Sequence, residues 1–454
     1  MVDCFKRDSE FKNSTHTNHV LAASARLFIN YSEMKQPANL AYKFRLYPNE
    51  EQKQMLNQMI GNARFAWNMM LARQLDHYKE TYRFKSKGEY LKAGEALKEL
   101  NSIKSDEEYS FLRVLPARCY AYVQLNLDTA WKKFFKEKAK GAGKPKFKPN
   151  RGWQSFQTDT TFTLDYDNRL FEIRKQYIPF KAKKNDKLYD VLNAGGYEKT
   201  ITVSRSPSHK YFLSISLHDP RKVDLPAPAE QPEAPVGIDW GVKDFACTSD
   251  GEVFEKNTAY LRMQKKLHRL QRKASRQYRM NAKPGQKWRE IKTSNWTKTQ
   301  QQIAKLHERI ANIRKDFIHQ ITNDLTERYD LIAIEDLNVK GMSSSVKPKK
   351  REDGKGYKQN GKKRKSGLNK NILNHSPHEF KRQLEYKSKW KGGQVVKVDR
   401  FFPSSKTCSC CGFVNKELSL KDRQWDCPEC RTHHHRDINA ALNIRNQAIK
   451  TTRQ

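Results

Sequence analysis

Four cysteines in the C-terminal part of the chain have the spacing of a metal site. Cys408 and Cys411 are separated by two residues, Cys427 and Cys430 repeat that gap, and fifteen residues lie between the pairs. Each Cys-x-x-Cys knuckle can present two thiolates to one tetrahedral Zn²⁺, and the intervening segment is long enough for a hairpin. Cys410 offers another sulfur, but it does not keep the two-residue gap. We therefore predict one structural Zn²⁺ bound by Cys408, Cys411, Cys427 and Cys430.

The remaining cysteines do not form a disulfide framework. The chain has eight cysteines among 454 residues, and five of them lie between Cys408 and Cys430. This clustering indicates a metal site in a reducing compartment, because disulfide scaffolds spread many cysteines over a short secreted chain. We expect Cys119 and Cys247 to be buried free thiols. A redox role of the knuckles is disfavoured because no thioredoxin-like βαβ pattern surrounds them.

Three carboxylates that are distant in sequence form a second candidate site. Asp239 ends the apolar run 236–239, Glu335 ends the run 330–335, and Asp437 precedes the Ala-rich helical pattern INAALNI. Taken singly, Asp437 would most often cap a helix, and each strand-end acid would be paired at a sheet edge. Together, their order along two strands and a last helix is that of an RNase H-like nuclease core. Such a core would hold two Mg²⁺ ions about 4 Å apart, or Mn²⁺ in their place, for phosphodiester hydrolysis.

The N-terminal half has the pattern of a strand, a helical region and further strands. Between residues 40 and 47, apolar residues alternate with Lys43 and Arg45, which is the period of a half-buried strand with a cationic outer face. Asn49 can cap the next helix, with Gln52 at the capping-box position. Helical patterning continues to about residue 140, and strand-like runs rich in Phe, Thr, Ile and Val follow the Gly- and Lys-rich break at 141–151.

The C-terminal half begins after a linker with four prolines, 224–235. Strand-like segments follow, with a turn at Asp250 and Gly251, and residues 259–325 have the pattern of a helical hairpin. Its second arm has one apolar seam, which we expect to pack in a core. Residues 347–365 hold ten Lys or Arg and almost nothing apolar, so we expect a disordered loop that contacts a phosphate backbone.

The charge of the chain points to a polyanionic partner. The formal net charge is +38, and a merely soluble basic surface usually carries a single-digit charge. Nucleic acid is the favoured partner. A membrane is disfavoured because no run approaches the roughly 18 to 20 apolar residues of a spanning helix.

Longer motifs resemble a known family. VGIDWGVKDFACTSDG, LIAIEDLNVKGM and HRDINAALNI resemble the three split motifs of the RuvC nuclease of TnpB, the insertion-sequence-encoded RNA-guided endonucleases. WDCPEC and the segment from LNKNILNHSPHEF to CSCCG are similar to the part between its second and third motifs, and LAYKFRLYPNEEQ is similar to its opening. The resemblance covers about residues 34–448.

The resemblance implies an α/β multidomain fold with an RNase H-like (RuvC) nuclease, an inserted zinc ribbon, and an N-terminal β-rich wedge domain with a helical recognition lobe. It implies an Mg²⁺-dependent DNA endonuclease of a transposable element, with Asp239, Glu335 and Asp437 as catalytic acids. A noncoding guide RNA would direct it to double-stranded DNA beside a short flanking motif. Candidate nucleic-acid contacts are Lys43, Arg45, Lys146, Lys148 and Arg436.

The expected domains follow the chain in order. They are a disordered leader (1–33), a wedge-domain strand (34–48), the recognition lobe (49–140), further wedge-domain strands (141–223), the linker (224–235), the nuclease (236–399) with hairpin 259–325 and basic loop 343–366, the zinc ribbon (400–432), the last nuclease helix (433–450) and a tail (451–454).

Some features depart from the family pattern, and some alternatives stay open. His435 stands where the family often has Asp, the leader precedes the usual opening, and the basic loop resembles an insertion. A nuclease-inactive RNA-guided repressor would lack one of the acids, whereas this chain has all three. A type V CRISPR effector would share the same core, and a transposase would lack the ribbon and lobe. We expect a monomer in the prokaryotic cytosol, associated with the nucleoid.

Overall fold

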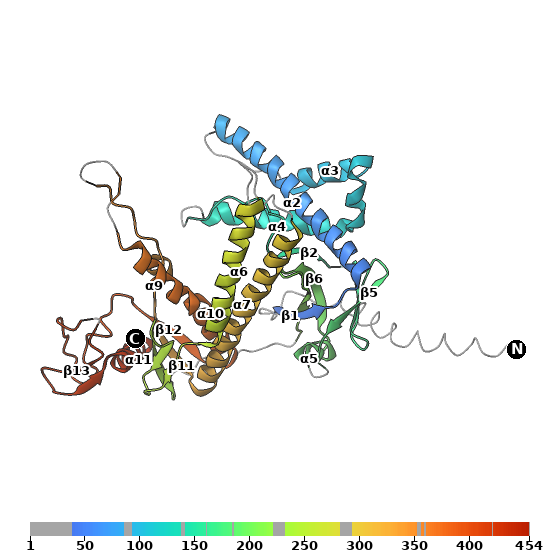
Figure 1. Ribbon diagram of the computed structural model, residues 1–454. Helices are drawn as coiled ribbons and strands as arrows, with labels where there is room; N and C mark the ends of the chain where they lie inside the picture. The colour runs from blue at the N-terminus through green and yellow to red at the C-terminus, as the bar shows by residue number, and fades with distance from the viewer. Residues whose placement is uncertain are drawn as a thin grey trace. The chain divides into compact units, whose positions relative to one another are not determined.

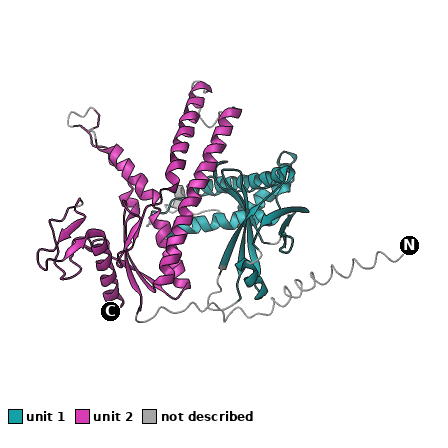
Figure 2. Cartoon of the chain, turned by 60° about the horizontal axis from the view of Figure 1, so that its bottom comes forward, with its two compact units in different colours: residues 1–223 teal, residues 224–454 magenta. Residues whose placement is uncertain are grey.

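The computed structural model describes residues 39–85, 93–137, 141–159, 161–183, 186–220, 232–281, 293–351, 356–357, 360–419 and 421–453. The chain divides into two compact units, residues 1–223 and 224–454 (Figure 2). The predicted leader 1–33 and most of the predicted linker 224–235 lie outside the described residues.

In its described part, unit 1 contains a seven-stranded antiparallel sheet in the order β2-β6-β7-β1-β5-β4-β3. The alternation predicted for the first strand is confirmed, because Phe44 and Leu46 are buried while Lys43 is exposed. The strands are β1 (Asn39–Leu46), β2 (Gln154–Thr158), β3 (Thr163–Asp165), β4 (Leu170–Ile173), β5 (Gln176–Lys181), β6 (Tyr197–Arg205) and β7 (Tyr211–His218).

Helices cover the apolar face of this sheet and share one core with it. The predicted capping box is confirmed: the Asn49 amide donates to Gln52 Oε1 (3.0 Å), and the Gln52 amide donates to Asn49 Oδ1 (2.8 Å). The helices are α2 (Glu50–Lys85), α3 (Ala93–Ile103), the 3₁₀ helix η3 (Glu107–Val114), α4 (Ala117–Glu137) and the short α5 (Lys187–Asn193).

Unit 2 is built on a mixed sheet, five strands wide among the described residues, in the order β10-β9-β8-β11-β12. Strands β8 (Pro235–Trp240), β11 (Leu331–Glu335) and β12 (Gln394–Val398) run parallel, with β12 at one edge. Strands β9 (Ala246–Thr248) and β10 (Val253–Phe254) pair antiparallel at the edge, around a turn at Gly251, which has φ +85°. The strands predicted to carry the two acids are therefore adjacent in space.

Helices lie on both faces of this sheet. On one face, α7 (Ser294–Arg328) and α10 (Pro377–Trp390) pack against Val236, Ile332 and Ile334. On the other face, α11 (Arg436–Thr452) packs against β8 and β11 through Ile444 and Ala448. Helix α6 (Ala259–Asn281) runs alongside α7 (Figure 1) and completes the predicted hairpin, whose apolar seam is buried as expected.

The predicted basic loop 343–366 is partly wrong. After the short helix α8 (Val339–Met342), residues 343–351 have no helix, but α9 (Lys362–Asn374) begins inside the predicted loop. Lys and Arg are good helix formers, and the buried side chain of Ile372 anchors the helix, so a high charge did not exclude helical structure here. Residues 352–355 and 358–359 lie outside the described residues. No helix in the described part of the chain is long and apolar enough to cross a bilayer.

A buried lysine joins two helices beneath the sheet of unit 2. Lys387 of α10 donates from Nζ to the carbonyl oxygen of His319 (3.0 Å) and to Thr322 Oγ1 (2.7 Å) of α7. Burial, and to a lesser degree the nearby charge of Lys391, lowers the pKa of Lys387 to about 8. The folded protein thus disfavours the charged form of this side chain.

This burial predicts a pH-dependent stability. Because the pKa of Lys387 is about 8 when folded and 10.5 ordinarily, the folded state binds fewer protons between these values, and the free energy of unfolding rises with pH there. We expect Lys387→Met to lose this rise, measured by urea unfolding at about pH 7 and about pH 9.5. Lys391→Met, which removes a more exposed ammonium and only the smaller cause of the lowered pKa of Lys387, should keep most of the rise. The same pH dependence in Lys387→Met and the unsubstituted chain would contradict this assignment.

Candidate active site and zinc centre

The four predicted cysteines gather at one point of unit 2. The sulfur atoms of Cys408, Cys411, Cys427 and Cys430 all lie within 4.8 Å of one another, and Cys408 and Cys427 are buried. Cys410 is exposed and is not part of this cluster, as the spacing predicted. Four convergent thiols with no open position are typical of a structural Zn²⁺ site. A structural zinc therefore fits these residues.

A histidine that the sequence analysis did not single out also lies in the zinc ribbon. Strands β13 (Gln424–Asp426) and β14 (His433–His435) form its hairpin, and the imidazole Nε2 of His434 lies 3.0 Å from Cys408 Sγ. A ring nitrogen at that distance can hydrogen-bond a metal-bound thiolate and so orient the ligand. The run of three histidines was the available signal, but it did not indicate which ring would turn inward.

Two asparagines attach the ribbon to α11. Asn439 accepts from the Ser409 amide (2.9 Å) and donates to the Thr407 carbonyl (2.7 Å). One turn later, Asn443 donates to the carbonyl oxygens of Ser404 (2.8 Å) and Thr407 (2.6 Å). Both asparagines are buried. The first knuckle is therefore held directly on the helix that carries Asp437, a link that was visible in the sequence only as two asparagines four residues apart.

The structure brings the three predicted carboxylates to one region of the sheet. Ile238 of β8 pairs with Ile334 of β11 in parallel register, so the residues that follow, Asp239 and Glu335, end neighbouring strands. Burial, followed by the negative charges of Asp437 and Glu335, raises the pKa of Asp239 to about 7. Burial also raises the pKa of Glu335. The charges of Asp437 and Glu335 therefore both act on Asp239, which places the three acids at a single site.

A close approach of backbones explains how α11 reaches this site. A Cβ atom on Gly237 would lie 1.9 Å from the Ala441 carbonyl oxygen and 2.6 Å from the Arg445 amide nitrogen. Only a residue without a side chain fits there, so α11 lies directly against β8. Asp437 is one turn before Ala441, and Asp239 is two residues after Gly237. This contact thus sets the position of one acid relative to the other.

Gly237→Ala should therefore impair both folding and function. We expect a loss of about 1–3 kcal/mol in the free energy of unfolding because the helix must move to admit the methyl group. Any cleavage activity should fall more steeply, since Asp437 moves with the helix. Urea unfolding and a divalent-cation-dependent nuclease assay measure the two effects. Gly367→Ala in α9, where an added Cβ would meet nothing within 4 Å, is the matched control, and equal behaviour of the two variants would refute the argument.

An arginine of the ribbon reaches the acids and was missed by the sequence analysis. Arg423 Nη1 donates to both carboxylate oxygens of Asp437, at 2.9 and 2.6 Å. The guanidinium of Arg423 thus pairs with the carboxylate of Asp437. Nothing in the sequence spacing indicated that Arg423 would lie there.

The acids fit a site for divalent cations. They supply only oxygen ligands from two strand ends and a helix, which is the donor set that Mg²⁺ prefers. Burial and the charges of Asp437 and Glu335 disfavour the ionised form of Asp239, so a bound cation would stabilise that form. All three side chains keep part of their surface accessible, which a substrate would need.

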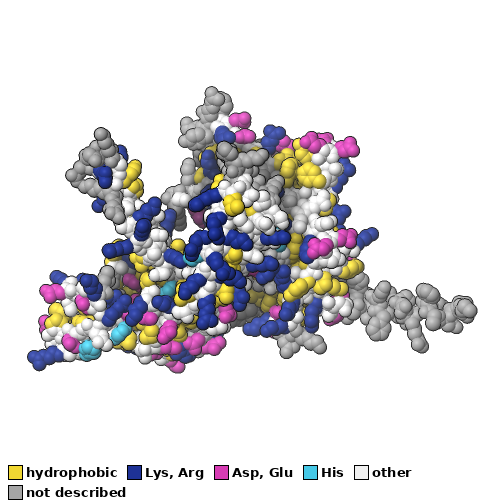
Figure 3. Space-filling view, in the orientation of Figure 1, with side chains coloured by type: hydrophobic (Ala, Val, Ile, Leu, Met, Phe, Trp, Pro, Cys, Tyr) yellow, Lys and Arg dark blue, Asp and Glu magenta, His cyan; other side chains and the backbone are white. Residues whose placement is uncertain are grey.

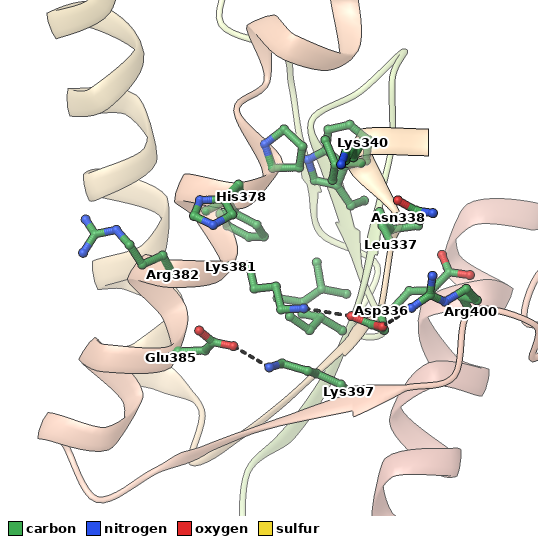
Figure 4. Close-up of a pocket in the computed structure, with 17 residues that line it drawn as sticks. Asp336, Leu337, Asn338, Lys340, His378, Lys381, Arg382, Glu385, Lys397 and Arg400 are labelled. Atoms are coloured by element: carbon green, nitrogen blue, oxygen red, sulfur yellow. Dashed lines mark hydrogen bonds and ion pairs between the residues drawn. The ribbon is translucent and has the colours of Figure 1, made fainter. Parts of the chain in front are cut away.

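A cleft of about 540 Å³ opens between α10 and the segment after β11 (Figure 4). Asp336, which directly follows Glu335, accepts there from Lys381 Nζ (2.9 Å) and from Arg400 (2.6 Å). Its amide also donates to the Val398 carbonyl (2.9 Å). These bonds fix the end of β11 from the face opposite α11, and so restrain the backbone that carries Glu335.

The four candidate nucleic-acid contacts of unit 1 lie beside aromatic side chains. Lys43 Nζ lies 4.2 Å from the ring centroid of Trp153, a side chain that is 54% exposed, and Arg45 lies over Phe212, all on the outer face of the sheet of unit 1. Lys148 Nζ lies 3.9 Å from the Trp67 ring centroid, and the Lys146 carbonyl accepts from Trp67 Nε1.

Arg436 is directed into the protein. Its side chain is 13% exposed, and it lies 3.6 Å from Asp437 and 3.4 Å from the Asp422 carbonyl oxygen. The geometry therefore favours a role in attaching the ribbon to α11 over direct contact with nucleic acid.

Three protein families match consecutive parts of the chain. "Helix-turn-helix domain" matches residues 34–83, "Probable transposase" matches 216–346, and "Cas12f1-like, TNB domain" matches 378–444, which includes the four cysteines. In the structure, the described part of the first match is β1 followed by a single long helix, α2.

Known proteins resemble nearly the whole chain. "Putative RNA-guided DNA endonuclease InsQ" of Escherichia coli (strain K12) is 31% identical over 405 residues, 89% of this chain and 91% of that protein. "Putative RNA-guided DNA endonuclease" of Streptomyces pristinaespiralis is 30% identical over 412 residues, 90% of each. A chain of "Cryo-EM structure of the Cas12f1-sgRNA-target DNA complex" has 18% identity and a TM-score of 0.50, and the match covers 88% of this chain and 83% of that one, a likeness of fold.

Fold and site together define a mixed α/β multidomain protein built like Cas12f, with a four-cysteine TNB zinc-finger domain. The long matches at about 30% identity identify the family as well. The chain belongs to the IS605 OrfB/TnpB family of RNA-guided DNA endonucleases, which is related to Cas12f.

Proposed function

We propose that this protein is an RNA-guided endonuclease of a transposable element that cuts double-stranded DNA beside a short flanking motif. The observation that carries the proposal is the convergence of Asp239, Glu335 and Asp437, in which burial and the charges of Asp437 and Glu335 raise the pKa of Asp239. A repressor that only binds DNA would not need three carboxylates gathered at one edge of a sheet. The names of the two long relatives support the same activity.

In the proposed mechanism, unit 2 is an RNase H-like (RuvC) nuclease. Two Mg²⁺ ions, when bound, would activate the attacking water and stabilise the leaving oxygen. Asp239, Glu335 and Asp437 would hold these ions, and Arg423 could turn from Asp437 toward the scissile phosphate, since a guanidinium suits both partners. Asp336, Asn439 and Asn443 would position the acids without touching the substrate.

Unit 1 would hold part of the guide RNA. Three cations lie close together on the outer face of its sheet. Lys181 of β5 pairs with Arg45 of β1, and Lys43 lies two residues before Arg45 on the same strand. The rings of Trp153 and Phe212 lie among them, 5.5 Å apart. Exposed rings beside cations are suited to unpaired bases and their phosphates. This face supports binding of a noncoding RNA.

The proposal is tested with the purified full-length protein. We expect a defined RNA to co-purify, and its sequence identifies the guide segment. The complex is then incubated with Mg²⁺ and a DNA library that carries the guide match beside randomised positions. Cleavage of a subset that shares a flanking motif is the expected result. Absence of a bound RNA, or cleavage that ignores the guide match, would refute the proposed function.

A further inference from the structure

Two of the three consecutive histidines in the ribbon hairpin have no part in the sites described above. Strands β13 and β14 pair in antiparallel register, and the directly opposite residues are Gln424 and His435, Trp425 and His434, and Asp426 and His433. Successive side chains of a strand point to opposite faces, and directly opposite residues share a face. The middle histidine, His434, turns toward the thiols, where its Nε2 lies 3.0 Å from Cys408 Sγ. His433 and His435 therefore lie on the other face of the hairpin.

The burial of these side chains agrees with this alternation. His433 is exposed and His435 is half-buried, whereas His434 between them is buried. Figure 3 shows His side chains at the surface in the region where β13 is drawn in Figure 1. Residues two positions apart on one strand are separated by about 6.6 Å. Two imidazole rings on such neighbouring positions can both reach one ion that lies between them.

The first of these rings has the partner that metal-binding histidines commonly use. His433 Nδ1 lies 2.7 Å from Asp426 Oδ1 across the hairpin. A carboxylate at that nitrogen holds the proton on Nδ1, which leaves Nε2 as a more basic electron-pair donor. As an ion pair the contact adds little to stability, because the two side chains are 62% and 74% exposed. Its main effect is to fix the tautomer and the orientation of the His433 ring.

The second ring has no hydrogen bond of its own. His435 Nδ1 is buried without a hydrogen-bond partner in the described part of the chain. His435 precedes α11, but its side chain does not cap that helix. A buried polar atom of this kind is typically explained by a bound water or ion. A turn about the Cα–Cβ bond of His435 would bring its ring to an ion held by His433, and no hydrogen bond to the described residues opposes that turn.

We propose that His433 and His435 form a second metal site, on the face of the ribbon opposite the four thiols. It takes a dication of the Zn²⁺, Ni²⁺ or Cu²⁺ class, because imidazole nitrogen suits these ions whereas Mg²⁺ prefers oxygen. Nε2 of His433 and a ring nitrogen of His435 are the protein ligands, and Asp426 orients the first ring. The site goes beyond the proposed function, since it uses neither the three carboxylates nor the thiols.

The position of this site connects it to the start of the last helix. Strand β14 ends at His435, and α11 begins at the next residue, Arg436, with Asp437 in its first turn. An ion bound by His433 and His435 therefore restrains the end of the strand and the residue from which the helix starts. Because the ion binds the folded hairpin, it stabilises the folded chain by mass action.

The test uses the full-length protein with its ribbon loaded with zinc. Ni²⁺ is the probe, titrated by isothermal calorimetry in excess Mg²⁺, which keeps Ni²⁺ from the carboxylates. The variants are His433→Gln, His435→Gln and Asp426→Asn, and His307→Gln, an exposed histidine of α7, is the control for other histidines. Atomic absorption follows the zinc content of each variant. His433 and Asp426 are exposed, so their variants should keep zinc and decide the test if His435→Gln loses it.

We expect the unsubstituted chain and His307→Gln to bind a Ni²⁺ ion that His433→Gln and His435→Gln do not bind at the same concentration. Asp426→Asn should bind it with an affinity about 10 to 100 times lower, the usual effect of losing an orienting carboxylate. Ni²⁺ should raise the unfolding temperature of the unsubstituted chain but not that of His433→Gln. Equal Ni²⁺ binding by His433→Gln and the unsubstituted chain, or loss of the same ion in His307→Gln, would overturn the proposal.

Discussion

Replacing Asp239, Glu335 or Asp437 by alanine is expected to lower the rate of DNA cleavage about a thousandfold or more. Each change removes a carboxylate from the site where three acids interact. Metal-ion catalysis supplies several kcal/mol of transition-state stabilisation, and each 1.4 kcal/mol is about tenfold in rate. The measurement is single-turnover cleavage of a matched duplex by the RNA-loaded protein over a range of Mg²⁺ concentrations.

The same variants should keep their RNA and their fold. The changes remove negative charge, so the cationic surfaces that bind phosphates are untouched. Without metal, Asp239→Ala should be at least as stable as the unsubstituted chain, because burial and two neighbouring acids already disfavour the ionised Asp239. Unfolding curves and the amount of co-purified RNA separate this outcome from a general loss of structure.

A control variant shows whether the effect is specific to the site. Glu327 is an exposed acid of the same unit that pairs with Lys391, and Glu327→Gln should cut at the normal rate because surface ion pairs contribute little. If any of the three alanine variants cuts as fast as Glu327→Gln, the assignment of that acid to the catalytic centre is wrong.

Replacing Cys427 by serine should have the second largest effect. Cys427 is one of four clustered thiols, and loss of a ligand from a structural Zn²⁺ site removes much of the free energy that folds the ribbon. We expect zinc content, measured by atomic absorption, and DNA cleavage to fall together. Cleavage falls because the ribbon supplies Arg423 and binds Asn439 and Asn443 on the helix that carries Asp437.

Cys410 provides a matched control within the same segment. It is an exposed cysteine beside Cys411 but outside the cluster, so Cys410→Ser should keep both zinc and activity. Zinc loss in Cys410→Ser but not in Cys427→Ser would show that the ligands were misassigned. Full cleavage by a zinc-free Cys427→Ser protein would show that the ribbon does not position the acids.

Local patterns predicted the elements of this protein well. The capping box of Asn49 and Gln52 and the alternation around Lys43 involve residues a few positions apart, and both are confirmed. The clustering of the four cysteines was predictable for a similar reason, since each knuckle is a local unit that needs only one partner. High charge was a poor guide at 362–366, where helix formation and one buried anchor made the start of α9.

The amino-acid sequence by itself determined the residue types: four thiols in two knuckles, carboxylates that end two apolar strands, and an excess of cations. Only the tertiary structure decided which groups meet. Gly237 lets α11 lie against β8, the ribbon brings Arg423 to Asp437, and the hairpin turns the cations of α6 outward. Such contacts join residues far apart in the chain, and their geometry depends on packing across a sheet, which no local spacing records.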